Sequence, residues 1–134
     1  MAVKEVIKTG IVLARHIPTE DWGEGLSFYS EDEEFIQVGA WGYNSGKELL
    51  AHIHNKVERK VYWTQEVLYI RKGSIEANIY DADEIFVEKI IAKEGDTLIL
   101  LRGGHGYKVL ENGTQVLEVK NGPYVGADKD RRRL

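Results

Sequence analysis

Three histidines and a glutamate carry the clearest chemical signal in this chain of 134 residues. His52 and His54 lie one residue apart, and Glu66 follows twelve positions after His54. A fourth candidate, His105, comes after the Gly-rich turn "RGG". Imidazole and carboxylate groups suit Fe, Mn, Co, Ni, Cu or Zn, and four protein ligands around an octahedral ion leave two positions open. The residue types therefore predict a divalent transition-metal site that water, dioxygen or a chelating substrate can enter.

Strands must aim these four side chains at one point. Side chains on a strand alternate between its two faces, so each candidate ligand shares a face with large apolar residues. Leu50 shares a face with His52 and His54. Glu66 shares a face with Tyr62, Leu68 and Ile70, and His105 shares one with Tyr107 and Val109. A buried carboxylate and three buried imidazoles are costly unless they are paired, and one divalent cation would pair all of them.

Short apolar runs alternate with turn signals along most of the chain. The runs are rich in β-branched and aromatic residues, and the separators contain Gly, Asp or Asn. The predicted strands are 35–43, 48–54, 61–70, 74–80, 84–91, 97–101, 106–110 and 114–120. No window of a dozen residues shows a clear period of 3.6, so helix should be scarce. This spacing predicts an all-β antiparallel sandwich or barrel.

The length is that of one domain. Residues 1–34 are expected to supply an N-terminal strand and an exposed acidic loop that pack on a barrel of residues 35–122. Residues 123–134 are expected to form a solvated tail, because its arginines follow alternating acids.

Composition limits the partners and the location. Apolar residues make up 43% of the chain, charged residues make up 30%, and the formal net charge is −4. That charge gives no electrostatic reason to bind nucleic acid or an anionic membrane. The chain has no cysteine, which excludes disulfides and thiolate chemistry. The start lacks a continuous apolar segment and no stretch is long enough to span a bilayer, so a cytoplasmic location is expected by default.

The first half of the pattern resembles the first motif of the cupin superfamily. That motif is Gly, five residues, His-x-His, then Glu, six residues and Gly, and it matches Gly46, His52, His54, Glu66 and Gly73. The ending "YIRKG" is similar to the end of that motif. Eleven residues separate His54 from Glu66, where the motif usually has three or four. Residues 55–62 are therefore read as an extended loop or a longer hairpin.

Two further positions decide how far the resemblance extends. Glu58 fits the short spacing from His54, but Glu66 lies at the expected distance before Gly73. The second cupin motif begins with Gly-Asp and brings a third histidine, which matches Gly95, Asp96 and His105. Its usual proline is replaced by Leu101, and its spacing is one residue short. Over residues 35–120 the resemblance implies a jelly-roll β-barrel whose metal is held by His52, His54, Glu66 and His105.

Cupin resemblance does not choose a reaction, because one fold hosts many functions. The first hypothesis is a small metalloenzyme that acts on a sugar or similar oxygen-rich metabolite in isomerase or epimerase chemistry, with Tyr107, Tyr62 or Lys108 moving a proton. The tail resembles cupins of polysaccharide and sugar-nucleotide pathways. The alternatives are an Fe(II) or Ni(II) dioxygenase and a non-catalytic module that binds a metal or a sugar.

Two interpretations concern residues outside the metal site. Ala51, Ile53, Val67 and Tyr69 fall on the face opposite the candidate ligands, and this apolar face predicts a homodimer. His16 has no ligand-like neighbour in the sequence and is interpreted as a surface residue.

Overall fold

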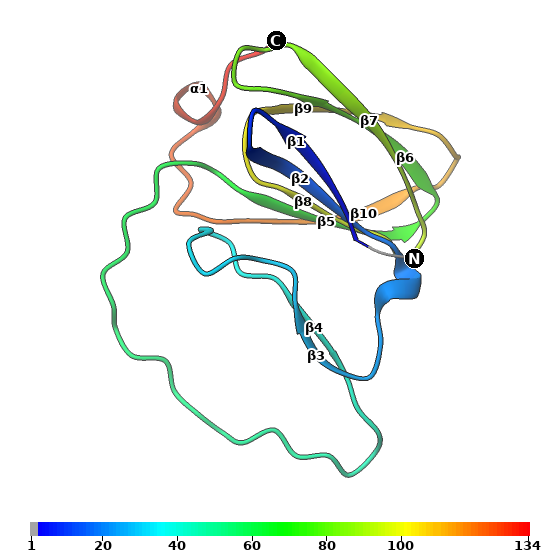
Figure 1. The fold of residues 1–134 in the computed structure, drawn as a ribbon, viewed down its shortest axis with the longest axis vertical. Helices are drawn as coiled ribbons and strands as arrows, with labels where there is room; N and C mark the ends of the chain where they lie inside the picture. The colour runs from blue at the N-terminus through cyan, green and yellow to red at the C-terminus, as the bar shows by residue number, and fades with distance from the viewer. Residues whose placement is uncertain (1–2) are drawn as a thin grey trace.

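Two antiparallel sheets face each other in the computed structural model, which describes residues 3–134 (Figure 1). The larger sheet has the order β1 (Lys4–Lys8), β2 (Ile11–Ile17), β8 (Thr97–Leu100), β5 (Glu66–Lys72) and β10 (Gln115–Lys120). The smaller sheet has the order β7 (Phe86–Lys93), β6 (Ser74–Tyr80) and β9 (Gly104–Val109). A separate hairpin pairs β3 (Gly25–Phe28) with β4 (Gly39–Gly42).

Helix is confined to one short turn and one four-residue segment of the described chain, η1 (Thr19–Asp21) and α1 (Ala127–Asp130). The predicted all-β antiparallel class is thereby confirmed. No helix within residues 3–134 is long and apolar enough to cross a membrane.

The core lies between the two sheets because alternate residues of each strand point inward. Ile70 on β5 and Leu98 on β8 are fully buried, as is Ala77 on β6. Other members of this cluster are Leu13, Leu68, Ile75, Ile79, Ile90 and Leu100. Each buried aliphatic side chain of this size contributes about 1.5–3 kcal/mol relative to exposure. Burial of these alternating residues fixes the register that positions the polar ends of β5 and β9.

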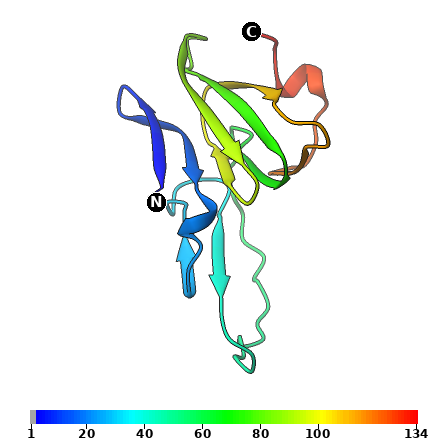
Figure 2. The same cartoon turned by 90° about the vertical axis from the view of Figure 1, so that its right-hand side faces the viewer.

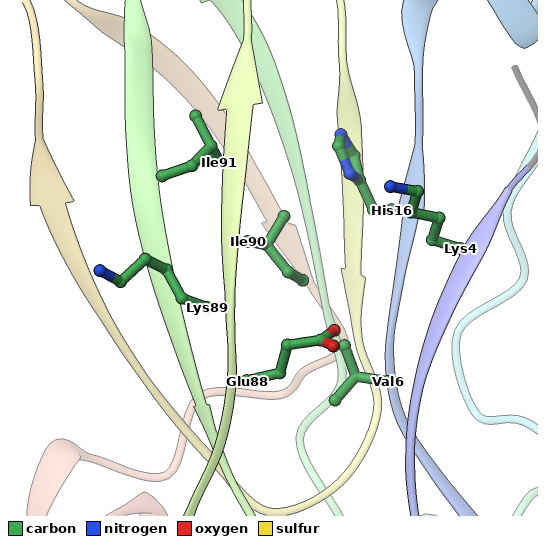
Figure 3. A pocket seen from close by; sticks show the side chains of 7 residues that line it. All are labelled: Lys4, Val6, His16, Glu88, Lys89, Ile90 and Ile91. Carbon is green, nitrogen blue, oxygen red and sulfur yellow. The ribbon is translucent and has the colours of Figure 1, made fainter.

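The sheets do not close into a barrel in the described part of the chain. Strands β10 and β9 are each the last strand of their sheet, so their outer edges have no strand partner among residues 3–134. At the opposite side, β1 and β7 approach each other and leave a cavity of about 320 Å³ (Figure 3). This cavity is lined by Lys4, Val6, His16 and the β7 residues 88–91.

The predictions for residues 35–65 are largely wrong. Residues 48–54 form no strand, only Gly39–Gly42 of the predicted 35–43 strand is extended in a ladder, and β5 begins at Glu66 rather than at residue 61. Residues 43–64, hereafter the 43–64 segment, are exposed throughout and loop away from the sandwich (Figure 1). A period-two pattern makes a strand only where a neighbouring strand takes up its backbone hydrogen bonds, and this segment has no such neighbour.

A second apolar cluster covers part of the outer face of the larger sheet. Ile17, Ile99 and Leu101 are buried there beneath residues 29–38, which cross the sheet between β3 and β4. The covering side chains include Tyr29, Ile36 and Val38. This packing explains why the outward-facing Ile99 is fully buried.

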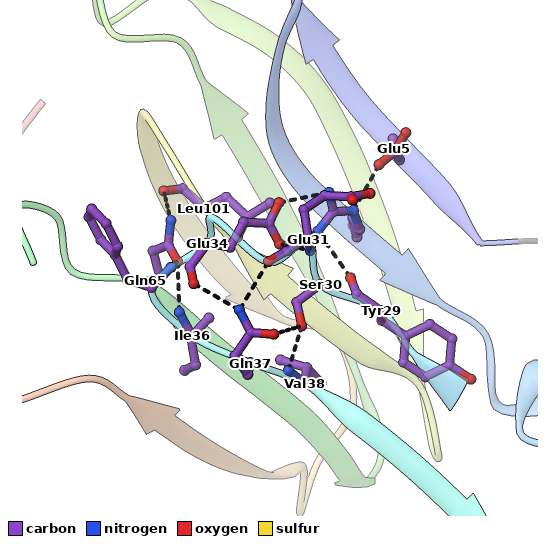
Figure 4. Close-up of polar contacts among 12 residues, drawn as sticks. Glu5, Tyr29, Ser30, Glu31, Glu34, Ile36, Gln37, Val38, Gln65 and Leu101 are labelled. Carbon is purple, nitrogen blue, oxygen red and sulfur yellow. Dashed lines mark hydrogen bonds and ion pairs between the residues drawn. The ribbon is translucent and has the colours of Figure 1, made fainter. Parts of the chain in front are cut away.

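Polar contacts fasten residues 29–38 to the sheet (Figure 4). The Arg15 guanidinium donates to both carboxylate oxygens of Glu34 at 2.6 and 2.8 Å. It also donates to Glu5 at 2.8 Å and to the Tyr29 carbonyl at 3.0 Å. The Gln65 amide oxygen accepts from the backbone N–H groups of residues 35 and 36 at 2.9 and 3.0 Å. Both ends of the loop that contains the 43–64 segment are therefore anchored near the start of β5.

Asp96 is a buried carboxylate in the turn between β7 and β8, with 1% of its surface exposed. It accepts hydrogen bonds from the backbone N–H groups of Thr19 at 3.0 Å and Lys93 at 3.1 Å, and it pairs with His16 Nε2 at 2.8 Å. The interpretation of His16 as a surface residue is therefore wrong, since its side chain is only 15% exposed. Burial opposes ionisation of Asp96, but the hydrogen bonds from His16, Lys93 and Thr19 hold its pKa below the ordinary range.

Replacing Asp96 with asparagine is expected to lower the free energy of unfolding by about 2–3 kcal/mol at pH 7. The substitution removes the buried carboxylate, so its donors lose their charge-assisted hydrogen bonds. A lowered folded-state pKa stabilises the fold above the ordinary aspartate value and loses that effect as pH falls through the folded value. The difference between wild type and variant should therefore shrink below about pH 4. Urea unfolding at several pH values measures it, with the exposed Asp83→Asn as control. An unchanged difference at pH 3 would contradict this account.

Candidate functional site

Glu66 is the first residue of β5 and points into the space between the two sheets. Its strand neighbours on the same face, Leu68 and Ile70, are in the core, which fixes the direction of the Glu66 carboxylate. The side chain is 9% exposed. A carboxylate at this depth needs a partner.

His105 supplies that partner from the facing sheet. It lies on β9 opposite the buried Ile79, so its side chain enters the same space. His105 Nε2 and Glu66 Oε2 are 2.7 Å apart, a charge-assisted hydrogen-bond distance. This bond holds the pKa of Glu66 below its ordinary range in spite of burial. The ionised carboxylate can only accept, so Nε2 donates this hydrogen bond and Nδ1 is the ring nitrogen that does not contact Glu66.

Glu118 adds a second carboxyl group to this pair. It lies on β10 opposite Leu68 in the ladder, so it shares the inner face with Glu66. The hydrogen bond between the two carboxyl groups, burial and the charge of Glu66 raise the pKa of Glu118. Lys120, the ladder partner of Glu66, lies beside both carboxyl groups, and its charge favours their ionised forms. One carboxyl group is thus kept ionised and its neighbour is biased toward the protonated form.

Tyr107 lies two residues beyond His105 on the same face of β9. The two rings stack with centroids 5.1 Å apart and an angle of 28° between their planes. Loss of solvent around the hydroxyl, together with the charges of Glu66 and Glu118, raises the pKa of Tyr107. Its hydroxyl therefore stays protonated and can donate a hydrogen bond at neutral pH. Ring stacking and the Glu66 contact fix the orientation of the His105 imidazole from two sides.

His52 and His54 lie elsewhere. Both belong to the exposed 43–64 segment, where their rings meet edge to face with centroids 4.9 Å apart. The structure thus brings the four predicted ligands together as two separate pairs, Glu66 with His105 and His52 with His54. Among residues 3–134, no three His, Asp or Glu side chains are grouped so that they could hold a metal ion. The donor types suit a transition metal, but their arrangement within one chain does not assemble the predicted four-ligand site.

Other sequence interpretations fall on the same exposed segment. Tyr62 is 73% exposed, and its ring meets the rings of Phe35 and Trp63 edge to face. No hydrogen bond joins Tyr62 to Glu66 or His105 among residues 3–134, and its proton-transfer role stays a prediction. Ala51 and Ile53 are not on a strand, so they share no sheet face with Val67 and Tyr69 as the dimer prediction required. Glu58 also lies in this exposed segment, away from any ladder.

The sequence interpretation missed Glu118 and Lys120. Their signal was present in "TQVLEVK", where period two places both on one face of β10. Finding them required the register with β5, which depends on packing between residues about 50 positions apart. A cavity of about 430 Å³ lies nearby, beside Arg15, Phe35, Trp63 and Gln65, but it does not include the Glu66–His105 pair.

Trp63 fixes the end of the 43–64 segment next to this cavity. Its ring stacks on Phe35 with centroids 5.5 Å apart, and the Arg102 guanidinium lies 3.9 Å from its ring centre. Asn121 adds two contacts, donating to the Trp63 carbonyl at 3.2 Å and accepting from the Gln65 N–H at 2.7 Å. These contacts hold the entry to β5, and thereby the position of Glu66.

Comparison of the chain with protein-family models finds no match, and neither a curated protein nor a solved structure matches it significantly.

Proposed function

We propose that this protein binds a small oxygen-rich metabolite, such as a sugar, beside Glu66 and His105 and moves a proton on it in isomerase or epimerase chemistry. The single observation that carries the proposal is the 2.7 Å contact between these two side chains across the facing sheets. An imidazole oriented by a carboxylate is a common general base.

The neighbouring groups support a division of roles. His105 Nδ1 would accept a proton from a carbon next to a carbonyl, and the electron pair would pass to the carbonyl oxygen. Glu118, with its raised pKa, would donate a proton to that oxygen, giving an enediol. Return of the proton from His105 to the former carbonyl carbon, while the Glu118 carboxylate takes the proton of the neighbouring hydroxyl, gives the isomer. Return of the proton to the opposite face of the original carbon, while Glu118 takes back the proton that it gave to the carbonyl oxygen, gives the epimer. Tyr107 would orient the substrate by a hydrogen bond from its hydroxyl.

A second candidate function is divalent transition-metal binding. Its support is that His52 and His54 lie side by side, as do Glu66 and His105, which makes two pairs of metal-competent donors. The one-chain arrangement keeps the two pairs apart, so this candidate requires a rearrangement or a second chain. With Fe(II) bound, the same four donors would also suit dioxygen chemistry.

Deuterium exchange in D₂O tests the proton-transfer function. A panel of aldoses and ketoses is incubated with the protein, and uptake of deuterium next to the carbonyl is followed by NMR. His105→Ala and Glu66→Gln should each slow exchange by about 10²–10⁴-fold, the range typical of general acid–base groups. Glu76→Gln is the matched control, because Glu76 lies on the outer side of β6 with Lys89 at 3.4 Å.

The outcomes separate the candidates. Exchange that needs His105 but survives a chelator and His54→Ala supports metal-free acid–base chemistry. Deuterium exchange that is lost in the His54→Ala variant, and that in the wild type is lost with a chelator and restored by added metal, supports the second candidate. Dioxygen uptake with Fe(II), or tight sugar binding without exchange in any member of the panel, would contradict isomerase chemistry.

A further inference from the structure

Two strand edges without a strand partner among residues 3–134 lie along the same side of the sandwich. Strand β10 ends the larger sheet, β9 ends the smaller one, and a short turn joins them (Figure 1). All six residues of β10 are exposed, and Val109 and Leu110 at the end of β9 are 62% and 42% exposed. Unpaired edges with apolar side chains are templates for another strand.

The directions of β5 and β9 determine how a strand added to the β9 edge would be oriented. His105 near the start of β9 meets Glu66 at the start of β5, so both strands begin at the same end of the sandwich. A strand formed by residues 47–54 and added antiparallel to β9 would end at that same end. His52 and His54, at its C-terminal end, would then lie beside His105. The pattern "ELLAHIH" would place both imidazoles on the face that looks into the gap.

Within one chain, the β3–β4 hairpin points residues 47–54 away from β9. β3 and β4 pair along their length, with the Phe28 ring packed so closely on Gly39 that an added Cβ would lie 2.9 Å away. Trp22 Nε1 donates to the Trp41 carbonyl at 3.3 Å. The hairpin projects from the sandwich, and the 43–64 segment continues beyond it (Figure 2). His52 and His54 are thereby directed away from the chain's own β9 edge.

The β3–β4 hairpin and the 43–64 segment, which together form the projecting part, expose many apolar side chains. Among its exposed side chains, Leu50 and Ile53 are 86% and 89% exposed, and Tyr62 is 73% exposed. Further exposed apolar residues on it are Leu26, Phe28, Trp41, Leu49, Val57 and Val61. Soluble monomers rarely expose so large an apolar group, which usually marks an interface. The free β9 and β10 edges, with exposed Val109, Leu117 and Val119, present matching apolar surface.

We propose that two copies of this chain exchange residues 43–54, so that His52 and His54 of one copy join Glu66 and His105 of the other in a shared metal site. The occupant of the free β9 edge is thus the same stretch of a second copy, in a closed two-fold arrangement. Residues 55–65 can span about 36 Å when extended, enough to cross between two sandwiches. The inference rests on the metal-binding function proposed above as the second candidate. It accounts for the two separate donor pairs and for the exposed apolar segment together.

Mixed dimers test the shared site. One variant carries His52→Ala and His54→Ala, the other carries Glu66→Gln and His105→Ala, and the two bear different affinity tags. Wild type should bind one Co(II) per chain in equilibrium dialysis, and each variant alone should bind none. The doubly purified mixed dimer should bind one Co(II) per dimer, because one of its two sites has all four donors. A mixed dimer that binds none, while wild type binds one per chain, would overturn the exchange.

A crosslink tests the exchange without metal, and the cysteine-free chain makes it unambiguous. Gly106 tolerates substitution, since a Cβ there would meet no atom within 4 Å. Ile53→Cys on one tagged copy and Gly106→Cys on the other should give a disulfide between chains after mild oxidation of the mixed dimer. Each variant alone is the control.

If no interchain crosslink forms, or if light scattering gives the 15.2 kDa monomer mass for wild type, the exchange is wrong. Failure of wild type to bind Co(II) while the crosslink forms would remove the metal function and keep the exchange.

Discussion

Arg15→Met is expected to lower the free energy of unfolding by about 3 kcal/mol and the melting temperature by roughly 10 °C. Arg15 is 5% exposed and donates four hydrogen bonds, to both oxygens of Glu34, to Glu5 and to the Tyr29 carbonyl. Methionine would fill much of the volume but would leave the Glu34 carboxylate without its partner. The expected loss of unfolding free energy lies at the low end of the range for a broken buried ion pair, because the Glu5 side chain is 38% exposed and can be rehydrated.

The matched control is Arg71→Met. Arg71 is exposed and bonds only the side chain of Gln115 among the described contacts, so its replacement should change stability by less than about 0.5 kcal/mol. Thermal unfolding followed by circular dichroism measures both. Limited proteolysis gives a second readout, because loss of Arg15 should expose the chain near Tyr29 and Phe35 to chymotrypsin. Equal losses for the two variants would show that the Arg15 network is not a specific anchor.

The Arg15 network matters for function because it sets where the projecting segment starts. Residues 29–38 are held on the outer face of the larger sheet by Arg15 and by Gln65, and Gln65 also precedes the candidate base partner Glu66. The same few residues thus position both the start of the projecting hairpin and the start of β5. A change there should alter the Glu66–His105 geometry and the proposed exchange between two copies together.

Local patterns were enough to predict half of the candidate site. Period two placed Glu66 with Leu68 and Ile70, and His105 with Tyr107, on inward faces, and both groups do meet between the sheets. The Gly95-Asp96 turn was also recognisable, although its aspartate serves as a buried hydrogen-bond acceptor for residues 19 and 93 and pairs with His16.

The other half depends on contacts that no local pattern contains. His52 and His54 have the alternation of a strand, but alternation alone does not supply the neighbouring strand that a ladder needs, and residues 48–54 form no strand. Residues 35–43 have the same apolar character, and only the four residues of β4 pair, with β3. Glu118 was missed for the same reason, since its closeness to Glu66 follows from the β5–β10 register.

Gly103→Ala is expected to lower the free energy of unfolding by about 4 kcal/mol or more and to displace His105. Gly103 precedes β9 with a φ of +74°, a conformation that costs an alanine about 1–2 kcal/mol. A Cβ on this residue would lie 2.1 Å from the Tyr80 carbonyl oxygen, so the backbone of β6 or β9 must move. Tyr80 and Gly104 are ladder partners, so the movement separates the strands next to the point where His105 enters the gap.

Gly113→Ala separates backbone strain from the clash. Gly113 has nearly the same φ, +75°, but an added Cβ would meet only the Lys72 ammonium nitrogen at 3.9 Å. This variant should therefore lose only about 1–2 kcal/mol in urea unfolding. The chemical shifts of the His105 ring should change in Gly103→Ala and stay near their wild-type values in Gly113→Ala. If both variants lose the same free energy, the Tyr80 carbonyl does not restrict residue 103, and the register that brings His105 to Glu66 must have another cause.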